Sequence, residues 1–135
     1  MSSSVTVTLP KEFAFVGAAL LSTAWLLFWQ TNVVSSARKK ADVPYPQLYA
    51  EKSETSSSSP SGFDKLRFNC AQRAHQNTLE ALPGIYLATL TTGFLGYPVF
   101  AASACGFWVF TRVLYTRGYA TGDPKRVRCS VFPYA

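Results

Sequence analysis

Three side chains that can bind a charged ligand recur at helical spacing in this 135-residue chain. Arg73, Asn77 and Glu80 stand at positions i, i+4 and i+7, so at about 100° per residue they share one face of a helix. Placing an ionisable side chain in the membrane interior costs a free energy of roughly 2.5 to 3.5 kcal/mol. Such groups therefore normally face a bundle interior or a water-filled cavity. The stripe therefore indicates a binding site, and the alternative is an Arg73–Glu80 pair that only neutralises itself.

A second polar stripe lies near the end of another apolar segment. Arg112, Tyr115 and Tyr119 occupy positions i, i+3 and i+7, again on one helical face. We expect the two stripes to meet at the same side of the membrane. The alternative for the tyrosines is an aromatic belt at the membrane interface, which needs no ligand.

Other chemistry has little support in the sequence. His75 is the only histidine, which excludes mechanisms with two imidazoles and favours a structural or intersubunit hydrogen bond. Cys70, Cys105 and Cys129 form no C-x-x-C pair, so we expect free thiols and no metal site. The net charge of +6 comes from Lys and Arg that flank apolar segments, which is typical of a membrane surface and does not predict nucleic-acid binding.

Three helices must position these side chains, and we expect them at about residues 12–36, 65–95 and 98–120. Residues 13–34 carry no charge, and a helix of that length reaches roughly 33 Å, enough to cross a bilayer core. The second helix begins amphipathic and becomes apolar after Glu80, with a kink expected at Pro83. The chain is thus predicted to be one all-α membrane domain, residues 1–135.

The stretch at about residues 41–63 is rich in Ser and charge and predicts a solvent loop. Basic residues crowd this loop and the C-terminal tail, whereas the turn at residues 96–98 has none. The positive-inside rule places the loop and the tail in the cytosol.

Two strings carry a resemblance to a known family: R-A-H-Q-N-T-L-E at residues 73–80 and R-V-L-Y-T-R-G-Y-A-T-G at residues 112–122. They resemble the membrane-associated proteins in eicosanoid and glutathione metabolism (MAPEG), and the similarity covers nearly everything from Leu9 to Arg128 apart from the Ser-rich insertion. The resemblance implies a multi-pass helix bundle of the endoplasmic reticulum membrane, with the mitochondrial outer membrane as the other location. It also implies a homotrimer with a glutathione site at each subunit boundary.

The resemblance also assigns roles to residues. Arg126 falls on the arginine beside the glutathione sulfur and is the expected catalytic residue. The positions expected to bind substrate are Arg38, Arg73, His75, Asn77, Glu80, Tyr115 and Tyr119. Guanidinium forks suit the two carboxylates of glutathione, and Glu80 suits its ammonium. Glutathione is then the co-substrate, and its thiolate attacks a lipid electrophile or hydroperoxide.

The family continues after the basic tail into a fourth hydrophobic helix, whereas this chain stops at Ala135. We therefore expect a MAPEG-like bundle with three transmembrane helices, the fourth missing and the C-terminus truncated. The expected function is that of a glutathione transferase or peroxidase of lipids, including leukotriene C4 synthase-like activity. The alternatives are a non-enzymatic lipid-binding or scaffold member of the family and an inactive truncated product.

Overall fold

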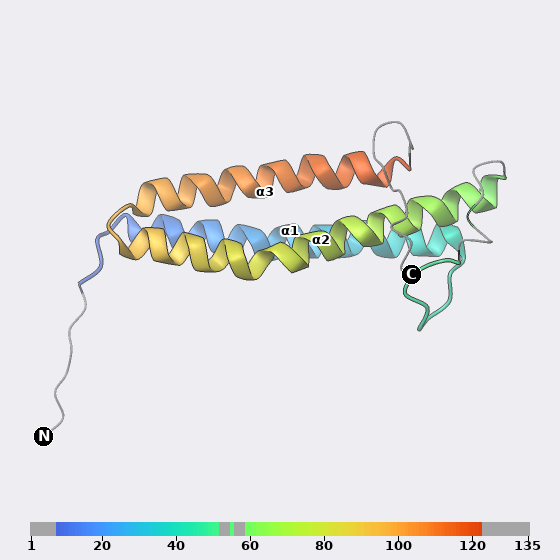
Figure 1. Ribbon diagram of the computed structural model, residues 1–135, viewed down its shortest axis with the longest axis horizontal. Helices are drawn as coiled ribbons and strands as arrows, with labels where there is room; N and C mark the ends of the chain where they lie inside the picture. Colours follow the sequence, from blue (N-terminus) through green and yellow to red (C-terminus); the bar gives the residue numbers. More distant parts are fainter. Residues whose placement is uncertain (1–7, 52–54, 56–58, 123–135) are drawn as a thin grey trace, which may run out of the picture.

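The computed structural model describes residues 8–51, 55 and 59–122, and this part of the chain folds into three α-helices. Helix α1 spans Phe13–Ala41, α2 spans Pro60–Phe94 and α3 spans Pro98–Ala120. The three helices lie side by side, and each packs against the other two (Figure 1). The start of α1 and the α2–α3 turn share one end of the bundle. The end of α1, the start of α2 and the end of α3 lie toward the other end (Figure 1). The predicted all-α fold is confirmed.

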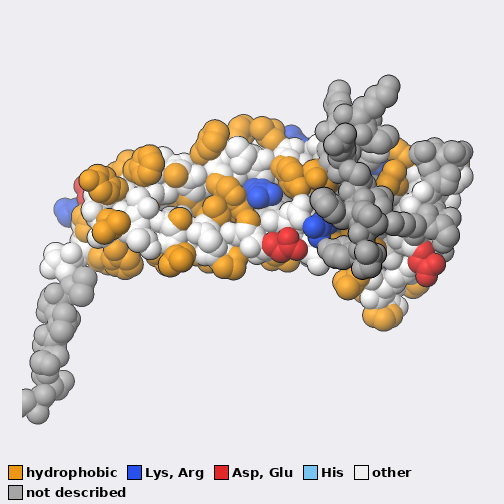
Figure 2. All heavy atoms as spheres, viewed as in Figure 1, with side chains coloured by type: hydrophobic (Ala, Val, Ile, Leu, Met, Phe, Trp, Pro, Cys, Tyr) orange, Lys and Arg blue, Asp and Glu red, His pale blue; other side chains and the backbone are white. Residues whose placement is uncertain are grey.

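Helices α1 and α3 are each long and apolar enough to cross a membrane. Most of their apolar surface is exposed, including Leu21, Trp25, Phe107 and Phe110. Figure 2 shows apolar side chains along the whole length of the face seen in that view. The charged side chains on it lie mainly in the half nearer the α1–α2 connection. Helix α2 is long enough but not apolar enough to cross a membrane along its whole length, because its first half is polar. Its 35 residues reach about 52 Å, longer than the ~30 Å hydrocarbon core, so the polar half extends toward the headgroups and water.

The helix ends differ from the expected bounds of 12–36 and 65–95 because capping signals extend both elements. Helix α1 continues to Ala41, with three basic residues in its last turn that favour the helix dipole. Helix α2 begins at Pro60, where the Ser59 hydroxyl accepts a hydrogen bond from the Gly62 amide at 3.1 Å. Serine at the N-cap followed by proline is a strong helix start. Figure 1 shows α2 bent in its middle, as expected from Pro83 inside it.

Residues 42–51, called the strap below, were expected to belong to a solvent loop but pack against α1 and α2. Val43 and Ala50 are buried in one apolar cluster with residues of both helices, including Phe68. The Arg38 guanidinium donates to strap carbonyls, at 2.6 Å for Gln47 and at 3.4 to 3.5 Å for Val43 and Pro44. It also lies between the rings of Phe68 and Tyr45, 4.5 Å from each centroid. The segment is irregular and most of its residues are exposed, as in a loop, but Val43 and Ala50 fix it to the two helices.

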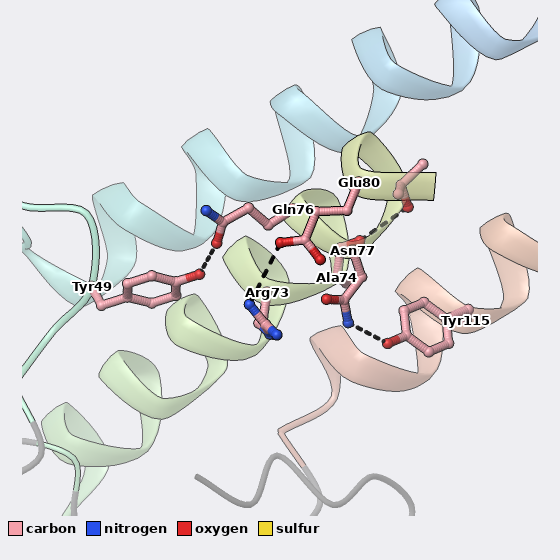
Figure 3. Close-up of polar contacts among 8 residues, drawn as sticks. Tyr49, Arg73, Ala74, Gln76, Asn77, Glu80 and Tyr115 are labelled. Carbon is pink, nitrogen blue, oxygen red and sulfur yellow. Dashed lines mark hydrogen bonds and ion pairs between the residues drawn. The ribbon is translucent and has the colours of Figure 1, made fainter. Parts of the chain in front are cut away.

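Two side chains of α2 hold the far end of the strap. Asn69 accepts from the Ala50 amide at 2.8 Å and donates to the Ala50 carbonyl at 2.9 Å, as a neighbouring backbone would. The Tyr49 hydroxyl donates to Gln76 (Figure 3). The strap therefore lies against the polar half of α2, beside the first predicted stripe.

The cysteines differ from one another. Cys105 is a buried free thiol, and its sulfur faces the Ala19 carbonyl at 3.7 Å. Cys70 is also buried but is disulfide-bonded, so the expectation of free thiols is wrong for that residue.

We predict that Asn69→Leu releases the strap without unfolding the bundle. Two backbone hydrogen bonds are lost, at about 1 kcal/mol each, so amide exchange over residues 43–50 should accelerate about thirtyfold. Hydrogen–deuterium exchange with mass spectrometry in detergent measures this. Asn32→Leu is the control, because the exposed Asn32 amide bonds only to its own helix at Phe28. Equal protection of the strap in the two variants would contradict the prediction.

Candidate functional site

The first predicted stripe forms one face of α2. Arg73 Nη1 lies 3.9 Å from Glu80 Oε1, with the two side chains 43% and 60% exposed. Asn77 stands between them along the helix, and Figure 3 shows the three side chains on α2 close to one another. An ion pair this exposed contributes about 0 to 1 kcal/mol. Both charged groups are therefore accessible to a ligand, and the ion pair between them is weak.

The second predicted stripe meets the first at Asn77. Its side-chain amide donates a 2.9 Å hydrogen bond to the Tyr115 hydroxyl across the α2–α3 interface (Figure 3). The Tyr119 ring packs on Tyr115 with centroids 4.3 Å apart. The Arg112 guanidinium lies 5.1 Å from the Tyr115 centroid and 5.2 Å from that of Trp108. The rings of α3 thus border the charged face of α2.

The structure places the other predicted ligand residues elsewhere. Arg38 is only 7% exposed, and its guanidinium holds the strap as described above. His75 Nδ1 forms a 3.2 Å hydrogen bond with Gln30 Oε1 of α1, on a different face of α2 from Asn77. Among the residues described, no side-chain hydrogen bond or ion pair joins Arg38 or His75 to the charged stripe. Arg126 lies outside those residues.

Helices α2 and α3 are held at this layer by a residue that the sequence analysis did not single out. Gln30 of α1 is 0% exposed and donates to the hydroxyls of Thr78 at 2.9 Å and Thr116 at 2.7 Å. Thr78 follows Asn77 in the chain, and Thr116 follows Tyr115. An amide side chain in a charge-free apolar stretch was the available signal, because such a group needs partners inside a membrane.

The arrangement is suited to a small ligand that carries charges of both signs. A carboxylate can approach Arg73, an ammonium can approach Glu80, and the Asn77 amide lies between the two. Charge-assisted hydrogen bonds contribute about 1.5 to 3 kcal/mol each, more than the exposed Arg73–Glu80 pair that they would replace. The site can therefore favour ligand binding over its own ion pair.

A comparison with known families gives independent support. No solved structure matches the chain significantly. The model of the MAPEG family matches residues 15–134, which include all of α2 and α3, α1 except its first two residues, and both polar stripes. Members of this family are largely glutathione-dependent membrane enzymes. With nearly the whole chain matched, the protein belongs to the MAPEG family of helical membrane proteins.

Proposed function

We propose that this protein is a membrane-bound glutathione transferase or peroxidase of lipid substrates, similar to the type-three microsomal glutathione S-transferases within the family. The observation that carries the proposal is the Arg73–Asn77–Glu80 face, accessible and bordered by Tyr115. Family membership makes glutathione the first ligand to consider for it.

Glutathione matches the charges of this face. It carries two carboxylates and one ammonium, so Arg73 can bind a carboxylate through both arms of its guanidinium. Glu80 can receive the ammonium, because its carboxylate is the more exposed partner of the pair. Asn77 and Tyr115 supply neutral hydrogen-bonding groups, and Tyr119 adds ring surface beside them.

The reaction requires activation of the thiol, not a nucleophile from the protein. A free thiol has a pKa near ~8.5, and a neighbouring guanidinium favours the thiolate through opposite charge. Arg126 is the residue proposed for that role. With an epoxide, the thiolate forms a C–S bond, the C–O bond breaks and the oxygen takes up a proton. With a hydroperoxide, the thiolate forms an S–O bond to the terminal oxygen, the O–O bond breaks and the alkoxide takes up a proton and leaves as the alcohol. The glutathione sulfenic acid then reacts with a second glutathione to give glutathione disulfide and water.

The assembly completes the proposal. In a homotrimer, a neighbouring subunit brings Arg38 and His75 to the boundary where glutathione binds, although neither touches the stripe within one chain. The lipid lies along the exposed apolar surface of α3, near Phe107 and Phe110. Residence in the endoplasmic reticulum membrane gives access to lipid substrate from the bilayer and to glutathione from the cytosol.

One observation favours a second function, that of a lipid-binding or scaffold protein without catalysis. Arg73 and Glu80 can neutralise each other, and the apolar helix surfaces are extensive without any ligand. Glutathione binding separates the two functions, because a scaffold does not require it.

Removal of either stripe charge should weaken glutathione binding with little effect on folding. For Arg73→Ala and Glu80→Ala we expect dissociation constants raised about 10- to 100-fold, from charge-assisted bonds of about 1.5 to 3 kcal/mol. Calorimetry on protein in lipid nanodiscs measures the affinity. Arg117→Ala is the control, because Arg117 is an exposed arginine at the same end of α3. The site would be rejected if the wild type bound glutathione no more tightly than the variant that carries both Arg73→Ala and Glu80→Ala.

The ammonium contact can be tested by changing the ligand. N-acetylglutathione lacks the positive charge, so the wild type should bind it about tenfold more weakly than glutathione. Glu80→Gln should bind the two ligands about equally, because the carboxylate that distinguishes them is gone. A persisting preference for glutathione in Glu80→Gln would place the ammonium elsewhere.

Turnover distinguishes the enzyme from the scaffold. Purified protein in nanodiscs should reduce a fatty-acid hydroperoxide or conjugate a lipid epoxide in the presence of glutathione, as followed by mass spectrometry. Arg126→Ala should lower kcat by about tenfold or more while leaving glutathione affinity nearly unchanged, because its proposed role is stabilisation of the thiolate. Glutathione binding without consumption of either substrate would favour the non-enzymatic function.

A further inference from the structure

The amide of Gln30 joins all three helices at one buried point. Its nitrogen donates to Thr78 of α2 and Thr116 of α3, and its oxygen faces His75 Nδ1 of α2. Among the described residues, no buried side-chain nitrogen or oxygen lacks a hydrogen-bond partner. The cluster is therefore a complete polar network within an apolar interior.

The hydrogen atoms of this network can be assigned from its partners. The Thr78 hydroxyl donates to the Ala74 carbonyl at 3.0 Å, and the Thr116 hydroxyl donates to the Arg112 carbonyl at 2.8 Å. Each hydroxyl has only one proton, so both can only accept from Gln30. The Gln30 NH₂ group must therefore face the threonines, and its oxygen must face the histidine. Because that oxygen is only an acceptor, His75 Nδ1 carries a proton, and in the neutral ring Nε2 carries the lone pair.

The same amide fixes the spacing of the two stripes. Thr78 and Thr116, which share the Gln30 nitrogen, each follow directly the residues that bond across the α2–α3 interface, Asn77 and Tyr115. A further hydrogen bond between α2 and α3 lies nearer the start of α2, where Arg67 Nε donates to the Ala120 carbonyl at 3.1 Å. The distance between the charged face of α2 and the tyrosines of α3 thus depends on Gln30 of α1.

We propose that Gln30 is a positioning residue for the candidate site, with two effects. It holds α2 and α3 at the separation that the Asn77–Tyr115 contact requires, and it fixes His75 in the Nδ1–H form, which makes Nε2 an acceptor for a ligand or partner N–H, O–H or S–H group. The first effect rests on the proposed function, since it matters for ligand binding. The second is a property of the folded chain alone.

Nitrogen NMR of His75 tests the tautomer directly. His75 is the only histidine, so ¹⁵N-histidine labelling of the full chain in nanodiscs gives one unambiguous pair of ring signals, provided that any affinity tag lacks histidine. At neutral pH the wild type should show a protonated Nδ1 and an unprotonated Nε2. Gln30→Met should shift the population toward the Nε2–H form. A wild-type ring protonated at Nε2, or identical spectra for the two proteins, overturns the assignment.

Glutathione affinity tests the spacing. Gln30→Met should raise the dissociation constant about tenfold, although Gln30 lies in the interior and touches no ligand. Thr23→Val is the matched control, because Thr23 is equally buried on α1 and its hydroxyl bonds to Tyr86 of α2 at 2.7 Å, nearer the other end of the bundle. It should lower the thermal midpoint comparably while leaving affinity and the His75 signals unchanged. Unchanged affinity in Gln30→Met, or an equal loss in Thr23→Val, overturns the positioning role.

Two further readouts keep the outcome decisive. If Gln30→Met does not fold, Thr116→Val removes only the α3 bond, so it should retain the Nδ1–H signal and still weaken glutathione binding. Unchanged affinity in Thr116→Val then overturns the positioning role. If the wild type binds no glutathione, the proposed function and the spacing effect both fail, whereas the His75 spectrum still decides the tautomer.

Discussion

A polar group inside a membrane bundle has no water to bond with, and the rest of this structure depends on how one such group is satisfied. The Gln30 amide uses both its nitrogen and its oxygen on side chains of the two other helices. An unsatisfied amide in an apolar medium costs several kcal/mol, so few helix arrangements tolerate this residue. The network therefore selects one register of α1, α2 and α3, which apolar packing alone would leave less defined.

In this register, two arginines near the same end of the bundle differ in their burial and in their partners. Arg38 is buried, and its guanidinium is occupied by strap carbonyls and two aromatic rings. Arg73 is partly exposed, and its guanidinium lies 3.9 Å from the more exposed carboxylate of Glu80. The first arginine organises the backbone, whereas the second lies at an accessible surface beside a carboxylate of opposite charge. Charge alone does not distinguish them; their partners do.

The sequence predicted the helices and the charged stripe well, because both depend on periodicity along one chain. Charge-free residues 13–34 identified the first span, and the spacing of Arg73, Asn77 and Glu80 identified a single face. The contacts between helices were harder to predict from the sequence. The Asn77–Tyr115 bond was anticipated only as a meeting of two stripes, and Gln30 passed unnoticed since its partners lie 48 and 86 residues away. The packing of the strap was not predicted, because polar composition does not reveal that Asn69 and Arg38 bond to its backbone.

The weakness of the Arg73–Glu80 pair follows from the same organisation and bears on how the site would operate. Because Thr78 and Thr116 are tied to Gln30, α2 and α3 keep their spacing without help from the surface charges. An exposed pair contributes about 0 to 1 kcal/mol, so breaking it costs the fold little. A ligand that carries a carboxylate and an ammonium can form charge-assisted contacts of about 1.5 to 3 kcal/mol each with these two groups, more than their mutual ion pair contributes. Rigidity supplied by the buried amide thus permits the charged groups at the surface to remain exchangeable.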